Sequence, residues 1–207
     1  MAVHKNPTRV VFDIGNVLVH WDPRRLYRTI FKTEAEVEDF LTRVLPPEWN
    51  LEQDRGRRWK DAEENQITLF PDYADAIRAF RARWIETVPH AIEGTVALLA
   101  KLKAAGVPLY AITNFASDTL IEAKAAYPFL AHSFIDMVVS GDEKLLKPDP
   151  AIYHVLLKRQ NLLATDCVFI DDSQKNVDAA AKLGFHALHF TSPDAFAKDL
   201  QALDFAM

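Results

Sequence analysis

The chain of 207 residues has the composition of an ordinary globular protein, with 49% hydrophobic residues, 26% charged residues and a formal net charge of −5. This length leaves room for one domain with an insertion rather than for two full domains. The slight acidity and the lack of a basic stripe argue against a nucleic-acid partner, because binding to a phosphate backbone depends on clustered Lys and Arg. No long apolar run precedes the first strand-like stretch, so we expect no signal peptide, no membrane anchor and a cytoplasmic location.

Apolar runs that end in polar residues alternate along the chain with segments of helical periodicity, which is typical of a parallel α/β sheet. The helices have readable ends: Gly106 and Gly184 follow two of them at C-terminal cap positions, and Asp149 with Pro150 begins another. We therefore expect a Rossmann-like parallel sheet with helices on both faces. The predicted strands are Arg9 to Phe12, Pro108 to Ile112, Met137 to Ser140, Cys167 to Ile170 and Ala187 to Phe190.

Residues from about Pro23 to Val88 interrupt this alternation. They contain no convincing strand and consist of charged, aromatic-rich helical patterns such as "RRLYRTIF", "EAEVEDFLTRVL" and "YADAIRAFRARWIE". About 65 residues between core elements are too few for an independent domain. We predict an α-helical cap insertion over residues 21–88, acting as a lid on a core formed by residues 1–20 and 89–207.

Polar residues cluster where the predicted strands end, which is where an open parallel sheet binds its ligands. Three carboxylates brought to one point repel each other unless a cation joins them, and Mg²⁺ prefers such oxygen ligands. Magnesium and Lys147 would together neutralise a phosphate dianion, leaving Asp13 free to attack phosphorus. The clustered residues are Asp13 after the first strand, Thr113 and Asn114 after the second, Lys147 in a later loop, and Asp171 and Asp172 after the fourth.

Four segments in this order, "FDIGNVLV", "YAITN", "LLKPDPAIY" and "VFIDDSQKN", resemble the four motifs of the haloacid dehalogenase-like hydrolase superfamily, and the insertion resembles its first cap class. "DIGN" together with "DRG" at residues 54–56 resembles the small bacterial sugar-phosphate phosphatases that hydrolyse anomeric hexose phosphates. The resemblance implies a nucleophilic Asp13, with Lys147 stabilising the charge of the phosphoryl group. It further implies the following ligands: Thr113, Asn114, Gly15 and Asn16 for the phosphoryl group, and Asp13, Asp171, Asp172 and the Gly15 carbonyl for magnesium.

Gly15 stands where this superfamily usually has a second aspartate, the general acid and base of the reaction. Such help is typically worth roughly 10²–10⁴-fold in rate. Three explanations remain open. His20 or Asp22 substitutes for the missing group, or the substrate has a leaving group acidic enough to depart unaided, or the reaction is not phosphoryl transfer.

The third explanation points to dehalogenation as the alternative reaction. A halide leaves without a proton, and the 2-haloacid dehalogenases of the same superfamily also lack this aspartate. Lys147 and Tyr153 suit either chemistry. Those dehalogenases are metal-free and tend to carry serine and asparagine in the "DDSQKN" segment, and paired Asp171 and Asp172 would repel a haloacid. We therefore expect a magnesium-dependent phosphatase of small phosphorylated metabolites, with a dehalogenase as the rival and a non-catalytic binding protein as a further alternative.

The cap offers candidate substrate contacts as well. Arg55 in the "DRG" segment and His20 just past Asp13 are predicted to contact the substrate, since bidentate donors suit sugar hydroxyls. Trp49 and Trp59 are suited either to stacking on a sugar ring or to forming the small core of the cap, and we favour the core. The sequence leaves the oligomeric state open.

Overall fold

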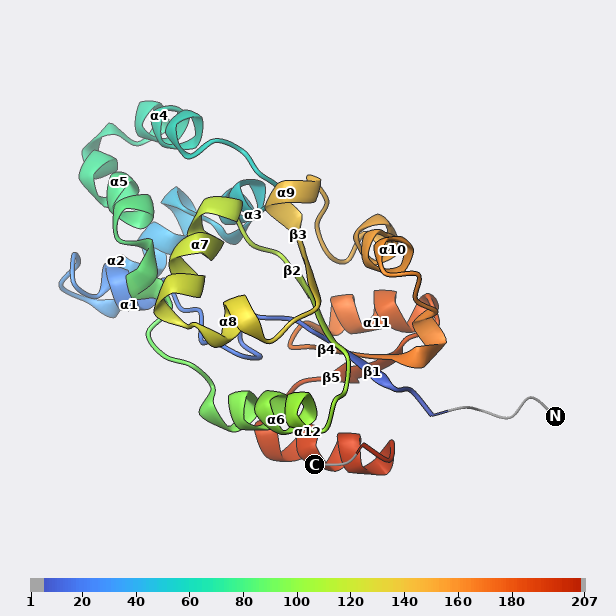
Figure 1. Ribbon diagram of the computed structural model, residues 1–207. Coiled ribbons are helices and arrows are strands. Elements are labelled where there is room, and N and C mark those ends of the chain that lie inside the picture. Colours follow the sequence, from blue (N-terminus) through green and yellow to red (C-terminus); the bar gives the residue numbers. More distant parts are fainter. Residues whose placement is uncertain (1–5, 206–207) are drawn as a thin grey trace.

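The computed structural model describes residues 6–205, and its centre is a five-stranded, fully parallel sheet in the order β3-β2-β1-β4-β5 (Figure 1). The predicted α/β fold is confirmed; β1 has the predicted bounds, and the ends of the other strands differ from the prediction by at most one residue. Thr113, expected just after its strand, is the last residue of β2 because it still pairs with Val139 of β3. The strands are β1 Arg9–Phe12, β2 Leu109–Thr113, β3 Asp136–Val139, β4 Cys167–Asp171 and β5 His186–His189.

Helices cover both faces of the sheet, so β1, β2 and β4 are buried almost throughout, as parallel strands usually are. Phe12 and Ile170 belong to the same buried cluster as residues of α6 and α12, whereas Val11 and Phe169 pack with residues of α10 on the other face. Figure 1 shows α6 and α12 side by side below the sheet. The helices of this part are α6 Glu93–Ala104, α7 Ser117–Ala126, α8 Phe129–His132, α9 Ser140–Glu143, α10 Pro150–Arg159, η4 Ala164–Asp166, α11 Gln174–Lys182 and α12 Pro193–Ala202.

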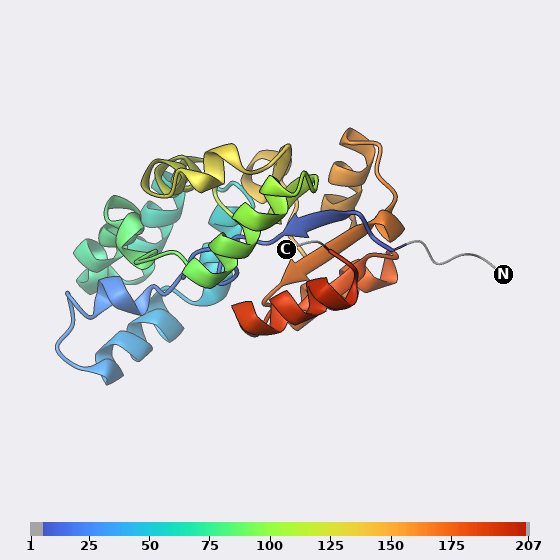
Figure 2. The same ribbon diagram turned by 60° about the horizontal axis from the view of Figure 1, so that its bottom comes forward.

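Residues 21–88, here called the helical segment, gather at one end of the molecule (Figure 2). All of them are described by the structure, and none lies in a strand of the sheet. Trp49 packs inside this segment, with ring centroids 6.0 Å from Trp59 and 5.7 Å from Phe80, so the tryptophans form its core as favoured from the sequence. Its elements are α1 Arg24–Tyr27, α2 Glu34–Asp39, η1 Phe40–Val44, α3 Pro47–Asp54, α4 Trp59–Leu69, η2 Pro71–Tyr73, α5 Ala74–Ala82 and η3 Trp84–Thr87.

The two connections between the helical segment and the sheet run side by side. The amide of His20 donates to the carbonyl of His90 at 3.0 Å, and the amide of Asp22 donates to the carbonyl of Thr87 at 2.8 Å. This pairing fixes the ends of the helical segment just beyond the carboxyl end of β1. Among the described residues, no helix is both long and apolar enough to cross a membrane.

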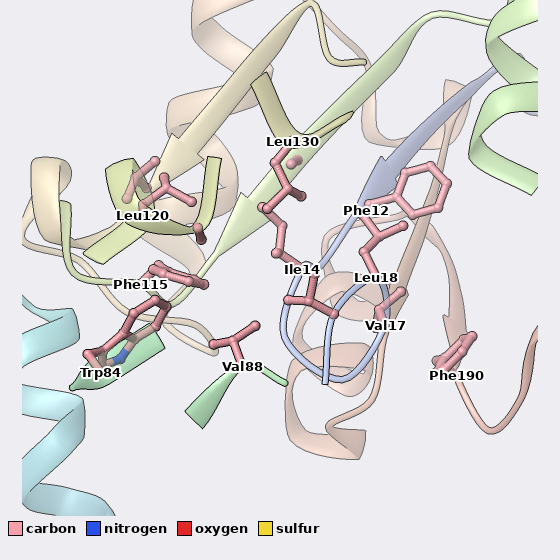
Figure 3. Packing of buried hydrophobic residues seen from close by; sticks show 14 of the residues in the cluster. Phe12, Ile14, Val17, Leu18, Trp84, Val88, Phe115, Leu120, Leu130 and Phe190 are labelled. Atoms are coloured by element: carbon pink, nitrogen blue, oxygen red, sulfur yellow. The ribbon is translucent and has the colours of Figure 1, made fainter. Parts of the chain in front are cut away.

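Further contacts seat the helical segment on the loops that follow β2. The ring of Trp84 lies against that of Phe115, with centroids 5.3 Å apart (Figure 3). Asp118 at the start of α7 accepts hydrogen bonds from the Trp59 indole at 3.0 Å and from the Arg81 guanidinium at 3.1 Å. The helical segment therefore covers the edge of the sheet at which the polar residues were expected.

Candidate active site

A buried lysine joins two buried carboxylates at the carboxyl ends of β1 and β4. Lys147 Nζ lies 2.7 Å from Asp13 Oδ1 and 2.6 Å from Asp171 Oδ2. The Lys147 side chain is 1% exposed, that of Asp13 10% and that of Asp171 0%. The three groups that the sequence predicted to meet are thus in direct contact, in surroundings where water screens their charges little.

The side chain of Asn114 makes two hydrogen bonds to the backbone of Lys147 and so positions this residue. Its Oδ1 accepts a hydrogen bond from the Lys147 amide at 2.8 Å, and its Nδ2 donates to the Lys147 carbonyl at 3.0 Å. Both ends of the side-chain amide are thereby engaged with the backbone of one residue, Lys147. The Asn114 side chain thus helps to place the residue that carries the ammonium group, while Asn114 also lines the cavity and its contact with a phosphoryl group stays a prediction.

Burial and charge act in opposite directions on this cluster. Burial alone would lower the pKa of Lys147, but Asp13 and Asp171 outweigh it and hold that pKa above its usual range. Burial raises the pKa of Asp13 to about 7, against the lowering effect of Lys147. One ammonium group does not balance the carboxylates around it, which is an arrangement that favours a further cation.

A third carboxylate completes an oxygen-rich group suited to a metal ion. One carboxylate oxygen from each of Asp13, Asp171 and Asp172 lies within 4.8 Å of the others. Asp171 is held in place by the Ser173 amide at 2.8 Å and by Asn176 Nδ2 at 2.9 and 3.1 Å. Burial raises the pKa of Asp172, and Asp171 adds to this. Oxygen donors alone, with a surplus of negative charge, fit a hard divalent cation such as Mg²⁺.

The hydroxyl of Thr113, at the end of β2, gives a second indication of a bound group. Its Oγ1 is one of three buried side-chain polar atoms without a hydrogen-bond partner among the described residues, the others being on Trp49 and Thr95. Leaving a buried hydroxyl unpaired costs about 1–3 kcal/mol. An anion with several acceptor oxygens would satisfy it, as expected for a phosphoryl group.

The loop after β1 turns sharply beside Asp13. Asn16 has a left-handed backbone (φ 54°), and its Oδ1 accepts a hydrogen bond from the Trp21 amide at 3.0 Å. Asn16 also acts on the carboxylate of Asp172 after β4, since it lowers the pKa of that group against the raising effect of burial. At Gly15, a Cβ atom would meet no other atom within 4 Å. The position of the missing aspartate is therefore open space.

The cluster opens into a cavity of about 470 Å³ between the sheet and the helical segment. Its floor is polar and includes Asp13, Asn114, Lys147, Asp172 and Lys175. Asn50 and Asp54 of α3 are the polar groups that the helical segment contributes. The remaining wall is apolar and aromatic, formed by Val19, Trp21, Pro47, Leu51, Trp84, Val88 and Phe115. The site thus combines a charged end with a wide apolar side.

Two residues expected to contact substrate lie away from this cavity. Val19 and Trp21 line it, and because side chains alternate along extended backbone, His20 between them points outward. The His20 ring is exposed and lies 4.5 Å from that of His90. Arg55 is 53% exposed and pairs with Glu52 at 3.6 Å. Direct substrate contact by His20 and Arg55 thus has no support from their positions.

Asp22, the other candidate for the missing acid and base, is also engaged elsewhere. Its carboxylate accepts a hydrogen bond from the Arg24 amide at 3.0 Å and lies 3.6 Å from the Arg28 guanidinium. It does not belong to the cavity lining. Neither sequence-derived substitute for the absent carboxyl group therefore reaches the site.

Sequence reasoning underestimated two residues. Asn176, which was not among the predicted site residues, binds both oxygens of Asp171, and its carbonyl accepts a hydrogen bond from the Tyr153 hydroxyl at 3.0 Å. Tyr153 is fully buried and so supports the loop instead of meeting substrate. The signal in the sequence was the position of Asn176 one helical turn after the two aspartates.

Residues 8–184 match the family model described as haloacid dehalogenase-like hydrolase. The chain belongs to this family. The match runs from β1 to α11, so it includes the first four strands of the sheet and every residue of the charged cluster. The resemblance of the four motifs is thereby confirmed.

Several members and neighbours of this family are similar over much of the chain. A sesquiterpene phosphatase of Aspergillus oryzae is 27% identical over 93% of this chain and 94% of its own length. A 6-phosphogluconate phosphatase of Escherichia coli is 30% identical over 61% of this chain, which spans 57% of that enzyme. An (S)-2-haloacid dehalogenase of Pseudomonas putida is 28% identical over 66% of this chain and 49% of that enzyme.

The fold also matches solved structures. A haloacid dehalogenase family enzyme of Bacteroides thetaiotaomicron, in complex with magnesium and inorganic phosphate, superimposes with a TM-score of 0.68 at 20% identity. The match covers 90% of this chain and 95% of that one. The helical segment and the sheet are thus both part of the shared architecture.

Proposed function

We propose that this hydrolase is a magnesium-dependent phosphatase that acts through a covalent phosphoryl intermediate on Asp13. The observation that supports this most directly is the contact of Asp13 with Lys147 at the polar end of the cavity. Asp13 Oδ1 also accepts a hydrogen bond from the Ile14 amide at 2.7 Å, so the carboxylate is held in one orientation. A fixed, buried carboxylate beside a cation is suited to nucleophilic attack on a dianionic group.

In this mechanism Asp13 attacks phosphorus and the bond to the ester oxygen breaks. Lys147 and the Thr113 hydroxyl stabilise the oxygens of the transferring group, and water then cleaves the acyl phosphate to release Asp13 and inorganic phosphate. Asp13, Asp172, Asp171 and the Gly15 carbonyl are the groups that would hold magnesium, which neutralises phosphoryl charge when bound. The phosphatases among the relatives, and the magnesium and phosphate of the structural neighbour, support this assignment.

The helical segment, residues 21–88, is proposed as the cap, and residues 1–20 and 89–207 as the core. Its seat over the charged end of the cavity would exclude bulk water from the reacting groups. The residues that it contributes to the wall would decide which organic group is admitted.

The wall of the cavity favours a phosphate ester whose organic part is largely apolar. Trp21, Trp84 and Phe115 present aromatic surface, while Asn50 and Asp54 are the polar side chains that α3 adds. Burying apolar surface is worth about 25 cal/mol per Å². Such a wall would bind an alkyl or isoprenoid group more tightly than a hexose, because the hydroxyls of a hexose would lose hydrogen bonds to water. The sesquiterpene phosphatase among the relatives points the same way.

Dehalogenation is the rival reaction, and the lack of an aspartate at Gly15 is the feature that favours it. The carboxylates of Asp13, Asp171 and Asp172 lie within 4.8 Å of one another and would repel the carboxylate of a haloacid in the absence of a metal. Hydrolysis of a phosphate ester with magnesium therefore fits the charges better. A purely binding role gives no reason for a buried lysine between two buried carboxylates.

The test is the release of phosphate from a panel of isoprenoid, alkyl, sugar and aryl phosphates, with and without magnesium, and of chloride from 2-haloacids. Magnesium-dependent phosphate release that disappears in Asp13→Asn is the expected result. Metal-independent chloride release would establish the dehalogenase instead. Inactivity on every ester, with magnesium binding intact, would contradict the proposal.

A further inference from the structure

Asp54, the last residue of α3, presents a carboxyl group to the cavity from the helical segment. It lines the same cavity as Asp13 and Gly15. The other carboxylates of the described lining, Asp13 and Asp172, both belong to the group suited to a metal ion. Asp54 is thus the carboxyl group of the lining that remains available for another task.

The structure fixes Asp54 firmly against the core. Its backbone carbonyl accepts a hydrogen bond from Ser140 Oγ at 2.6 Å, and Ser140 Oγ in turn accepts one from the Phe115 amide at 2.8 Å. The carboxyl group accepts a hydrogen bond from Asn50 Nδ2 at 3.0 Å. The backbone of Asp54 is therefore tied to the segments after β2 and β3, and its side chain is held within α3.

The residues that follow explain the "DRG" pattern in physical terms. Gly56 has a left-handed backbone (φ 92°), and a Cβ atom there would lie 2.7 Å from the carbonyl oxygen of Gly141. Only glycine permits this close approach to α9. The turn leaves Arg55 in solvent while Asp54 stays on the cavity side. The pattern thus serves to place Asp54, with Arg55 as an outward-facing residue of the turn.

We infer that Asp54 provides the general acid and base that Gly15 cannot, a role that rests on the phosphatase function proposed above. The carboxyl group would approach the leaving oxygen from the cap side, opposite the core position that the aspartate at Gly15 would occupy. A proton donor on the wall next to the organic group is well placed for an oxygen that joins this group to phosphorus.

The protonation state of Asp54 agrees with this role. Burial raises its pKa to about 8, against the lowering effect of the Ala116 amide, so the carboxyl group holds its proton at neutral pH. A general acid works best with a pKa near the working pH. The charged groups around it are Asp13, Asp172, Lys147 and Lys175 across the cavity, Lys144 of α9, bound to the Gly141 carbonyl, and Asp118 of α7, bound to Arg81.

The proton balance of the two steps is complete. As Asp13 attacks phosphorus and the ester bond breaks, the Asp54 carboxyl gives its proton to the departing oxygen, which leaves as an alcohol. In the second step the Asp54 carboxylate takes a proton from water, whose oxygen attacks phosphorus and breaks the bond to Asp13. Asp54 ends protonated and Asp13 ends as a carboxylate, ready for the next cycle.

The test compares wild type with Asp54→Asn on alkyl and aryl phosphates in the presence of magnesium. An alkoxide needs a proton to leave, whereas a nitrophenolate does not. Release of the alcohol should therefore slow by at least about 10²-fold in Asp54→Asn. Release of nitrophenolate, measured in the burst phase, should stay within about threefold of the wild-type rate. Asp118→Asn is the matched control, because it removes a carboxylate that also joins helical segment and core but lies outside the cavity. It should affect both esters alike.

The pH profile gives a second readout that a merely structural residue would not move. Wild type should lose activity on the alkyl ester above about pH 8 as Asp54 ionises, and this limb should be absent in Asp54→Asn and restored in Asp54→Glu. An equal loss in the first-turnover release of alcohol and of nitrophenolate in Asp54→Asn, or an unchanged basic limb, would overturn the inference while leaving the phosphatase intact. Wild type without activity on any ester would instead overturn the proposed function.

Discussion

Substitution of Gly15 by aspartate would measure how far proton transfer to the leaving group limits the rate of the reaction. A Cβ atom at this position meets nothing within 4 Å, and the backbone is not in the left-handed region. Gly15→Asp should therefore be accommodated without strain, with a change in unfolding free energy within about 0.5 kcal/mol. The new carboxyl group would stand two residues from Asp13, on the core side of the cavity.

The size of the effect depends on what already supplies the proton. General acid–base help is worth roughly 10²–10⁴-fold, or about 3–5 kcal/mol in the activation free energy. If Asp54 acts as inferred, Gly15→Asp should change kcat/KM for an alkyl phosphate by less than about tenfold. In the Asp54→Asn background the same substitution should restore at least about 10²-fold.

The assay is a double-mutant cycle of Gly15→Asp and Asp54→Asn, with kcat/KM measured on one alkyl and one aryl phosphate. Gly15→Asn is the control of equal size without an acidic proton, and it should restore nothing. A gain of about 10²-fold in both backgrounds would mean that Asp54 contributes nothing in wild type. No response in either background, with both proteins folded, would refute the reasoning that a missing acid matters at all.

Three further outcomes follow from the contacts of the site. Acid-quenched wild type should show phosphorylation of Asp13 by mass spectrometry, and Asp13→Asn should abolish both this phosphorylation and turnover; phosphorylation that persists would assign the nucleophile to another residue. Lys147→Met leaves Asp13 and Asp171 buried without their cation, so urea unfolding should show a loss of about 3–5 kcal/mol; an unchanged midpoint would mean that the ion pairs are not formed. Trp84→Ala removes aromatic wall, so KM should rise more for an isoprenoid phosphate than for a small alkyl phosphate; equal changes would exclude an apolar group beside Trp84.

The fold was predictable because its signals are local. The central strands β1, β2 and β4 are mostly apolar runs bounded by polar residues. The N-cap at Asp149, which accepts a hydrogen bond from the Ala151 amide at 2.9 Å, is also visible in the sequence. The convergence of Asp13, Lys147 and Asp171 follows from the parallel sheet alone, because the carboxyl ends of its strands share one edge. Strand ends shifted by one residue where pairing with a neighbour extended them, as at Thr113.

The residues that the helical segment and the loop before it bring to the site could not be predicted from local sequence patterns. Nearness in sequence suggested His20, but the alternation of side chains along extended backbone directs it away from Asp13. Arg55 was chosen for its chemistry, yet its neighbour Asp54 is the one that faces the cavity. Asp54 is held at the cavity by a hydrogen bond to Ser140, which lies 86 residues away along the chain, and no local sequence pattern reports such a contact.

An acid on the helical segment, in place of an aspartate at Gly15, would make proton transfer depend on how this segment is seated. Under the proposals made above, an acid on the core loop would be present whether or not the helical segment is seated, whereas Asp54 would stay at the cavity only while its backbone is bound to Ser140. Proton transfer would then require a seated helical segment, and an organic group that fills the apolar wall would favour that state. An ester too small to hold the cap would meet Asp13 and Lys147 but not the acid. The enzyme would thus discriminate between small and large esters by the rate at which the alcohol leaves as well as by the strength of binding.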